Sequence, residues 1–153
     1  WNSTAPTSSV INIGANFQSN GSSQAMVHYC WTSISGFSKF GKYSGNGNSN
    51  GVFVHLGFEP AWVMIKCFST SGNGWTIHDN KRMPFNGSST ETTLYANSSQ
   101  AEQTSGGNLI DFLSNGFKVR GTNTNINGSR TYIYMAFAEH PFVGDGTSPV
   151  TAR

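Results

Sequence analysis

The sequence has little charge. Asp, Glu, Lys and Arg make up only 10% of its 153 residues, where about a quarter is usual for a globular domain. The net charge of +2 is small and its positive residues are scattered, so we expect no nucleic-acid partner. A surface solvated by amides and hydroxyls suits close packing of many copies, because like charges would repel one another.

Long apolar runs are also lacking. None reaches the roughly 18 residues that a membrane-spanning helix needs, so we expect no membrane insertion. The first residues, WNSTAP, contain neither the basic segment nor the apolar core of a signal peptide. The chain does not begin with methionine, and we expect it to be part of a longer polypeptide or a processed product.

Cysteine occurs twice, at Cys30 and Cys67, each within a short apolar run. We predict two buried free thiols, because unpaired cysteine behaves as a small apolar residue. A single disulfide is the alternative. It requires an oxidising compartment and neighbouring strands, which the sequence does not reveal.

The residues that are abundant indicate a folded β-domain. Gly, Asn, Ser and Thr form about 45% of the chain, and aromatic residues form 13%, an apolar content that disordered segments lack. No segment repeats its apolar residues with a helical period. We therefore predict an all-β, antiparallel β-sandwich of jelly-roll type. At most one short helix is expected, near residues 98–103, with Ser98 as its cap.

The strongest local pattern lies between residues 108 and 139. An apolar run reaches Asn115-Gly116, which predicts a tight type I′ hairpin. Residues 131–138, TYIYMAFA, are apolar on both faces, and we predict that they form the central strand. The expected strands are residues 10–13, 25–31, 37–43, 52–56, 61–68, 75–79, 93–96, 109–113, 117–119 and 131–138.

The chain contains an internal echo. Residues 10–32 read as a strand, an Asn/Gly/Ser loop and AMVHYCWT, and residues 117–138 read as a strand, a similar loop and TYIYMAFA. Such echoes also arise by chance in β-proteins with Asn-Gly turns. The alternative is that the first segment is the end of a preceding repeat. The predicted organisation is an N-terminal arm and strands at 1–35, a β-sandwich at 36–143 and a tail at 144–153.

Motifs for catalysis and metal binding are weak. Residues 47–51 match G-x-S-x-G, but they lie between two strand patterns, whereas a nucleophile elbow needs a helix after it. His55, His78 and His140 show no compact ligand spacing. His78 and Asp79 are adjacent on a strand, so their side chains point to opposite faces. We expect Asp79 to pair with Lys81 or Arg82, and we predict no catalytic site, metal or cofactor.

Two binding surfaces are conceivable. Glycan recognition would use Trp75 beside the loop residues Asn73, Asn123 and Asn125, because exposed aromatic rings stack on sugars and amides bind hydroxyls. The same residue types are common in turns. Self-assembly would use Phe37, Phe40 and Tyr43, which we place on one face of their strand. Trp62 lies in an apolar strand run, and we expect it to be buried in the core.

Several blocks of the sequence resemble a known family, namely a repeat domain in predicted virion proteins of tailed phages that infect marine bacteria. The blocks are GFSKFGKYSGNG, VFVHLGFEPAWVMIK, WTIHDNKR, LYANSSQAE and IDFLSNGFKVRGTNTNINGSRTYIYMAFAEHPF. They cover residues 36–142 nearly continuously. Residues 10–32 resemble the last third of a previous copy, and the final VTAR resembles the ends of such tail-fibre-like or appendage proteins.

The resemblance implies a place on the virion surface and a structural or adsorption role. We therefore expect a non-enzymatic module of a fibre, appendage or capsid decoration. Its expected partners are further copies of itself, for example in a trimer, and other virion proteins. The Ser/Thr/Pro-rich residues 1–9 would connect to a preceding module or pair with a neighbour's sheet edge. The alternative is a carbohydrate-binding module that recognises host surface glycans.

Overall fold

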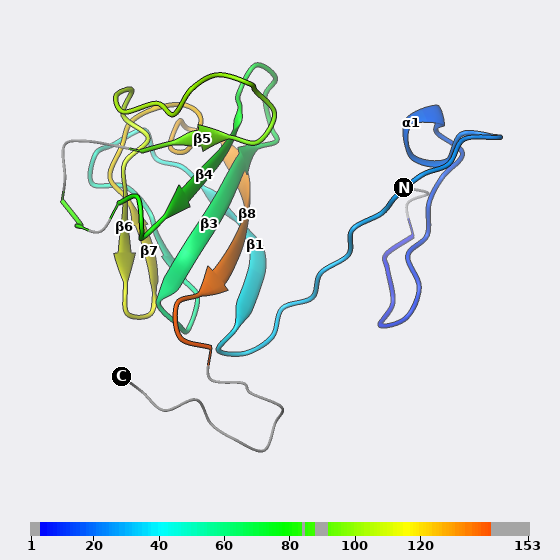
Figure 1. Ribbon diagram of the computed structural model, residues 1–153, viewed down its shortest axis with the longest axis horizontal. Coiled ribbons are helices and arrows are strands. Elements are labelled where there is room, and N and C mark those ends of the chain that lie inside the picture. Colours follow the sequence, from blue (N-terminus) through cyan, green and yellow to red (C-terminus); the bar gives the residue numbers. More distant parts are fainter. Residues whose placement is uncertain (1–3, 84, 88–91, 142–153) are drawn as a thin grey trace. The chain divides into compact units, whose positions relative to one another are not determined.

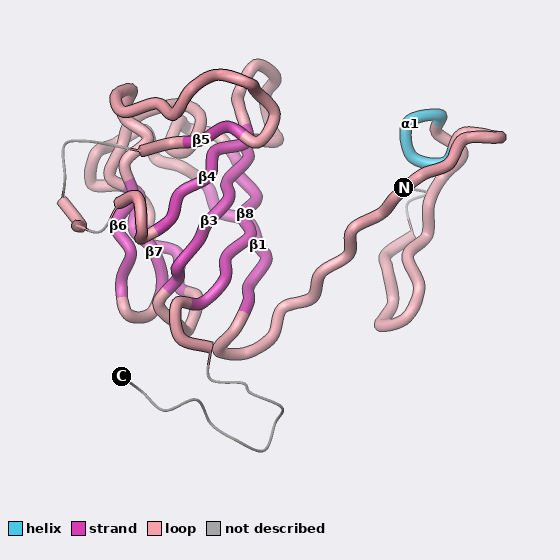
Figure 2. The backbone as a smooth tube through the Cα atoms, in the orientation of Figure 1, coloured by secondary structure: helices cyan, strands magenta, loops and turns pink. Residues whose placement is uncertain are grey.

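The computed structural model describes residues 4–83, 85–87 and 92–141. The described residues up to Trp31 form one compact unit and those from Thr32 onward form another. The second unit is the β-sandwich that the sequence predicts, with eight strands in two antiparallel sheets. Much of the chain between the strands is loop (Figure 2), in keeping with its many Gly, Asn and Ser residues.

The larger sheet has five strands in the order β1-β8-β3-β4-β5. Residues 131–138 are central, as predicted, because β8 pairs with β1 on one side and with β3 on the other. The two edges of the sheet are β1 and the very short β5 (Figure 1). The strands are β1 (Ser38–Ser44), β3 (Pro60–Cys67), β4 (Trp75–Asp79), β5 (Leu94–Tyr95) and β8 (Thr131–Ala138).

The smaller sheet has three strands in the order β2-β7-β6. They are β2 (Phe53–His55), β6 (Ile110–Leu113) and β7 (Gly116–Val119). One face of this sheet packs on one face of the larger sheet. The ring of Phe117 lies 6.1 Å from that of Tyr43 and 5.7 Å from that of Tyr134, centroid to centroid. These aromatic contacts join the two layers.

The core follows from the period-2 alternation of the central strands. Val63, Ile65 and Cys67 on β3 are fully buried, as are Tyr132 and Ala136 on β8. Residues between these positions lie on the opposite face of the sheet and are only partly covered. Cys67 is a free buried thiol, as predicted.

Polar loops close one end of the sandwich. The Tyr43 hydroxyl donates to the Ile126 carbonyl (2.6 Å). The Asn127 amide nitrogen donates to the carbonyls of Asn48 (2.7 Å) and Gly121 (2.9 Å). Because Asn127 is fully buried, these bonds replace those that its amide would make to water. The loop that contains Ile126 and Asn127 is therefore part of the folded core.

The 110–119 hairpin forms, but its turn differs from the prediction. Leu113 pairs with Gly116, so the two turn residues are Ser114 and Asn115, and neither has the positive φ of a type I′ turn. Gly116 is instead the first residue of β7. A Cβ atom there would lie 2.1 Å from the Val54 carbonyl oxygen on β2. The glycine serves close strand approach rather than the turn.

The N-terminal unit differs more. Among its residues 4–31, which the structure describes, the one regular element is the short helix α1 (Phe17–Asn20), capped by Asn16. The strands predicted at 10–13 and 25–31 are wrong, because strand hydrogen bonds need a partner strand and the described part of this unit supplies none. Cys30, predicted to be buried, is free and exposed.

Two other expectations concern residues outside the strands. No helix forms over residues 98–103; the Ser98 hydroxyl accepts a hydrogen bond from the Gln100 N–H (3.2 Å), which makes a local turn. The predicted C-terminal tail at 144–153 lies outside the described residues. No helix among the residues described is long and apolar enough to cross a membrane.

Candidate functional site

The outer face of the five-stranded sheet, the face turned away from the smaller sheet, is apolar across its whole width. In strand register, Phe40 pairs with Met135, Met135 with Met64, Met64 with Ile77, and Ile77 with Leu94. Paired residues lie on the same side of a sheet. One residue from each of the five strands therefore contributes to a continuous apolar row.

A second row lies beside the first. It runs from Lys42 through Ile133 and Lys66 to Trp75. Ile133 at its centre is 38% exposed. The Lys66 ammonium group lies 5.9 Å from the centroid of the Trp75 ring, a separation at which a cation is attracted to an aromatic face. The two lysine stems extend the apolar surface. The Lys42 side chain is exposed, whereas the Lys66 ammonium group donates a hydrogen bond to the Asn73 carbonyl.

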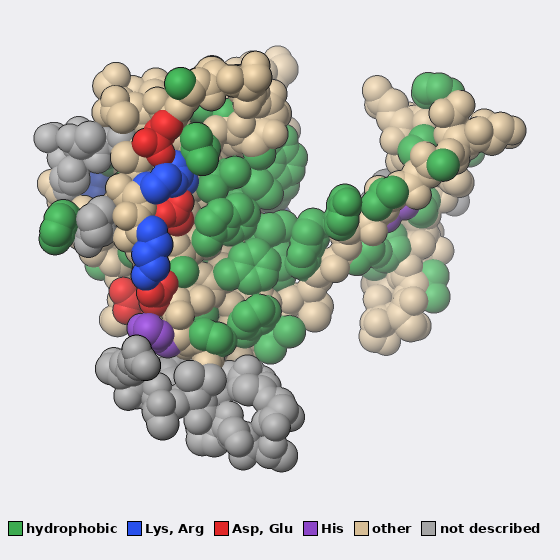
Figure 3. All heavy atoms as spheres, in the orientation of Figure 1, with side chains coloured by type: hydrophobic (Ala, Val, Ile, Leu, Met, Phe, Trp, Pro, Cys, Tyr) green, Lys and Arg blue, Asp and Glu red, His purple; other side chains and the backbone are tan. Residues whose placement is uncertain are grey.

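Aromatic rings gather at the other end of the face. The Phe137 ring centroid lies 5.9 Å from those of Phe37 and Phe40 and 5.8 Å from that of Trp62. Figure 3 shows the resulting apolar area over β1, β8 and β3. Within the β-domain, no described element covers this face. Large uncovered apolar faces of this kind commonly mark binding surfaces.

The outer face contains a shallow hollow of about 550 Å³. Phe40, Met64, Trp75, Ile133 and Met135 contribute to its lining. The hollow thus has strands β1, β8 and β3 as its floor and the start of β4 as one wall. Its chemistry suits an apolar side chain better than a polar ligand.

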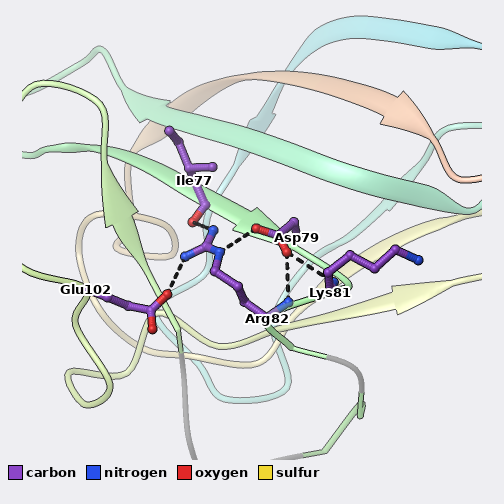
Figure 4. Close-up of polar contacts among 5 residues, drawn as sticks. All are labelled: Ile77, Asp79, Lys81, Arg82 and Glu102. Carbon is purple, nitrogen blue, oxygen red and sulfur yellow. Dashed lines mark hydrogen bonds and ion pairs between the residues drawn. The ribbon is translucent and has the colours of Figure 1, made fainter.

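Charged residues border the face at the end of β4, where Figure 3 shows a line of them. Arg82 bonds Asp79 (Nε to Oδ2, 2.6 Å) and Glu102 (Nη1 to Oε1, 2.7 Å), as Figure 4 shows. The predicted pairing of Asp79 at this strand end is confirmed. Partial burial opposes ionisation of Asp79, but hydrogen bonds from the Arg82 backbone and side chain outweigh it and lower its pKa. A charged rim around an apolar centre is typical of protein interfaces.

The residues predicted for assembly separate into two groups. Phe40 lies on the outer face, and Phe37, which precedes β1, packs on the same Phe137 ring. Tyr43 does not: it is buried against Phe117 in the core. Positions three apart on a strand face opposite sides, so Phe40 and Tyr43 cannot share a face. Trp62, expected in the core, is half-buried on the outer face.

The residues predicted for glycan binding come together, but their amides are already bonded within the protein. The Asn125 side chain accepts from Gly74 N–H (3.2 Å) and donates to the Tyr95 hydroxyl (3.2 Å). Asn123 donates to the Gly106 carbonyl (2.5 Å). Asn73 is nearly buried and accepts from Arg130 (3.3 Å). These amides hold the loops together, while the ring of Trp75 lies on the outer face.

The candidates for catalysis do not assemble. Residues 47–51 run from β1 to β2 through a loop without a helix, so they do not form a nucleophile elbow. His78 is fully buried and Asp79 lies on the other side of β4, as their adjacency predicts. Among the residues that the structure describes, no group of three His, Cys, Asp or Glu side chains is placed to hold a metal ion.

Sequence reasoning missed most of the outer face. It placed the runs at 61–68 and 131–138 in the core, which accounts for only alternate residues of each. The residues that alternate with the buried ones, among them Met64, Ile133 and Met135, lie on the outer face. The available signal was that both runs are apolar on both faces. In a two-layer sandwich only one face of a sheet meets the other sheet, so the second apolar face of each run has to lie on the outside.

The fold and this face define an all-β sandwich domain with a broad, uncovered apolar sheet face. The chain belongs to the family described as Domain of unknown function (DUF7483), which matches residues 1–141. The matched range includes residues of both compact units. Comparison with curated proteins found no match, and comparison with solved structures found none.

Proposed function

We propose that this domain is a non-enzymatic structural module of a phage virion that assembles with itself, or docks on other virion proteins, through the outer face of its five-stranded sheet. The observation that carries the proposal is the continuous apolar row across all five strands. The resemblance of residues 36–142 to repeat domains of virion proteins supports the location on a particle surface.

The composition supports the same function. Copies that pack closely on a particle must not repel one another, and this chain has a net charge of only +2. An apolar centre bordered by the Asp79, Arg82 and Glu102 ion pairs combines the hydrophobic core and polar rim of a stable interface. A second copy of this chain, for example within a trimer, is the partner that the proposal names first.

The test is the mass of the chain in solution across a concentration series, measured by light scattering for the parent and for two matched variants. Phe40→Lys places a charge on the outer face. Phe53→Lys is the control, because Phe53 is also a partly exposed phenylalanine on an edge strand, but of the other sheet.

We expect the parent to form a dimer or larger assembly. A charge at Phe40 should raise the dissociation constant at least tenfold, since an unpaired charge in an apolar interface is costly. The control variant should assemble like the parent. A parent that is monomeric at every concentration, or two variants with equal effects, would contradict assembly through this face.

The alternative function, recognition of host surface glycans, is favoured by one observation. The ring of Trp75 is only partly buried, at the end of the sandwich where Asn73 and Asn125 lie. Exposed aromatic rings stack on the apolar faces of sugars. Because the neighbouring amides are bonded internally, this alternative depends on Trp75 alone.

A further inference from the structure

The same hydrogen-bonded turn occurs twice in the chain. The side-chain oxygen of Asn16 accepts from the backbone N–H two positions later (2.8 Å), and its carbonyl accepts from those three and four positions later (3.0 and 2.7 Å). Asn123 makes the same three bonds, at 2.8, 3.1 and 2.8 Å. A side-chain oxygen bonded two residues ahead is common in turns, so the resemblance needs support from the flanking sequence.

The flanking sequence supplies that support. Both turns end in Asn-Gly-Ser, at residues 20–22 and at residues 127–129. Both are followed within a few residues by an apolar run, MVHYCW at 26–31 and YIYMAF at 132–137. The second run is β8, the strand with partners on both sides. A turn and a strand that recur in the same order indicate a repeated structural unit.

The first run begins one residue farther from its Asn-Gly-Ser sequence than the second run does. Aligning MVHYCW with YIYMAF residue by residue assigns a face to each position of the first run. Tyr132, Tyr134 and Ala136 face the core, and the residues between them face outward. By correspondence, Met26, His28 and Cys30 would face inward, and Val27, Tyr29 and Trp31 outward. The small Cys30 would take the place of the fully buried Ala136, and Trp31 would take that of Phe137 on the outer face.

In the N-terminal unit this run is exposed. Val27 is 77%, Tyr29 74% and Trp31 55% accessible. A strand-forming sequence with large apolar side chains and no partner strand lacks the burial that would stabilise it. One position departs from the correspondence: the Tyr132 hydroxyl bonds Gly128 N–H (2.6 Å) in its own turn, and Met26 cannot make that bond.

We propose that residues 11–31 are the end of a strand equivalent to β7, the closing turn and the last strand of a second module of this same fold. Residues 26–31 would occupy the position of β8 in that module, hydrogen-bonded on both sides by strands equivalent to β1 and β3. The partner is therefore a copy of the sandwich that lacks its own β8. The last strand of one module would lead within a few residues into Ser38, the start of the next module's β1. The proposal is independent of the outer face.

The test adds such a module to the chain. A second copy of residues 32–116, which lacks β8 and all of β7 after Gly116, is placed directly ahead of residue 11 of the chain, so that residues 11–13 take the place of residues 117–119. Amide hydrogen exchange is followed by mass spectrometry in peptides from 25–31 and from 131–138. A reference protein carries residues 117–137 in place of residues 11–31 at the junction. The 131–138 peptides report in every variant that the downstream module is folded.

We expect exchange at 25–31 to slow at least a hundredfold relative to the parent chain and to approach that of β8, because central strands exchange only through large-scale opening. Two substitutions test which side chains of this run face the core. Met26→Asp should abolish the slow exchange at 25–31, whereas Val27→Asp should retain most of it. Exchange at 25–31 as fast as in the parent chain would overturn the proposal, as would equal effects of the two substitutions.

Discussion

At the scale of single residues, His78 is the most unusual side chain. It is fully buried, and neither ring nitrogen has a hydrogen-bond partner among the described residues. Desolvation by burial lowers its pKa from 6.5 to about 3, with nearby Arg82 acting in the same direction. Sequence reasoning predicted that His78 and Asp79 face opposite ways. It could not predict which of them is buried, because that depends on which face of the sheet meets β6 and β7.

The buried histidine should make the fold sensitive to acid. Its folded pKa lies below its unfolded pKa, so only the unfolded chain takes up the proton between pH 3 and 6.5, and stability falls as pH falls. From pH 7 to pH 5 the loss should be about 2 kcal/mol. Urea denaturation of the parent and of His78→Leu at several pH values in this window checks the prediction.

The His78→Leu variant should lose most of that pH dependence, because leucine fills the buried site with an apolar side chain and removes the titrating group. His55→Leu is the control, because His55 is exposed, and it should retain the slope of the parent. If His78→Leu and the parent lose stability equally between pH 7 and pH 5, the buried imidazole is not the cause.

At the scale of elements, the sequence predicted which segments suit a strand better than it predicted which strands pair. The alternation at 75–79 and the apolar run at 131–138 correspond to β4 and β8 with the same bounds. The run at 25–31 carries an equally strong pattern yet forms no strand. The pattern reports which residues suit a strand, but the hydrogen bonds depend on a neighbour that local sequence does not specify.

The hairpin of β6 and β7 illustrates the same limit. Asn115-Gly116 predicted a hairpin, and one forms, but with a different turn because Gly116 has a second role. Its position is occupied closely by the β2 backbone, with the Val54 carbonyl oxygen 2.1 Å from where a Cβ would be. A contact between β2 and β7, separated by some sixty residues, is invisible to a local turn rule.

Gly116→Ala should therefore destabilise the domain by about 1–3 kcal/mol, the usual cost of forcing an extra carbon into a packed site. Gly128→Ala is the matched control, because a Cβ there would meet nothing nearer than 3.3 Å, and it should cost less than about 1 kcal/mol. Urea denaturation gives both values. Similar losses for the two variants would show that β2 can move aside and that the close approach is not required.

At the scale of the whole molecule, the two candidate functions meet on one surface. Trp75, the residue on which glycan recognition depends, lines the same hollow as Phe40 and Met64. A copy of the chain seated on the outer face would cover that ring, so assembly and glycan binding compete for it. The sequence predicted both functions separately, because strand register, which brings these residues together, emerges only in the folded sheet.

Two tryptophan substitutions distinguish these functions. Trp75 lies at the loop end of the outer face and Trp62 at the opposite end, in register with Phe137 and Asp79. If the face is an assembly surface, Trp75→Ala and Trp62→Ala should each weaken self-association about tenfold, as expected when an aromatic anchor is removed from an interface. Sedimentation equilibrium measures this effect.

If the domain instead recognises glycans, only Trp75→Ala should reduce binding to a panel of soluble polysaccharides, and self-association should be unchanged in both variants. We expect the first result, because apolar side chains cover both ends of the face while the amides beside Trp75 are already bonded within the protein.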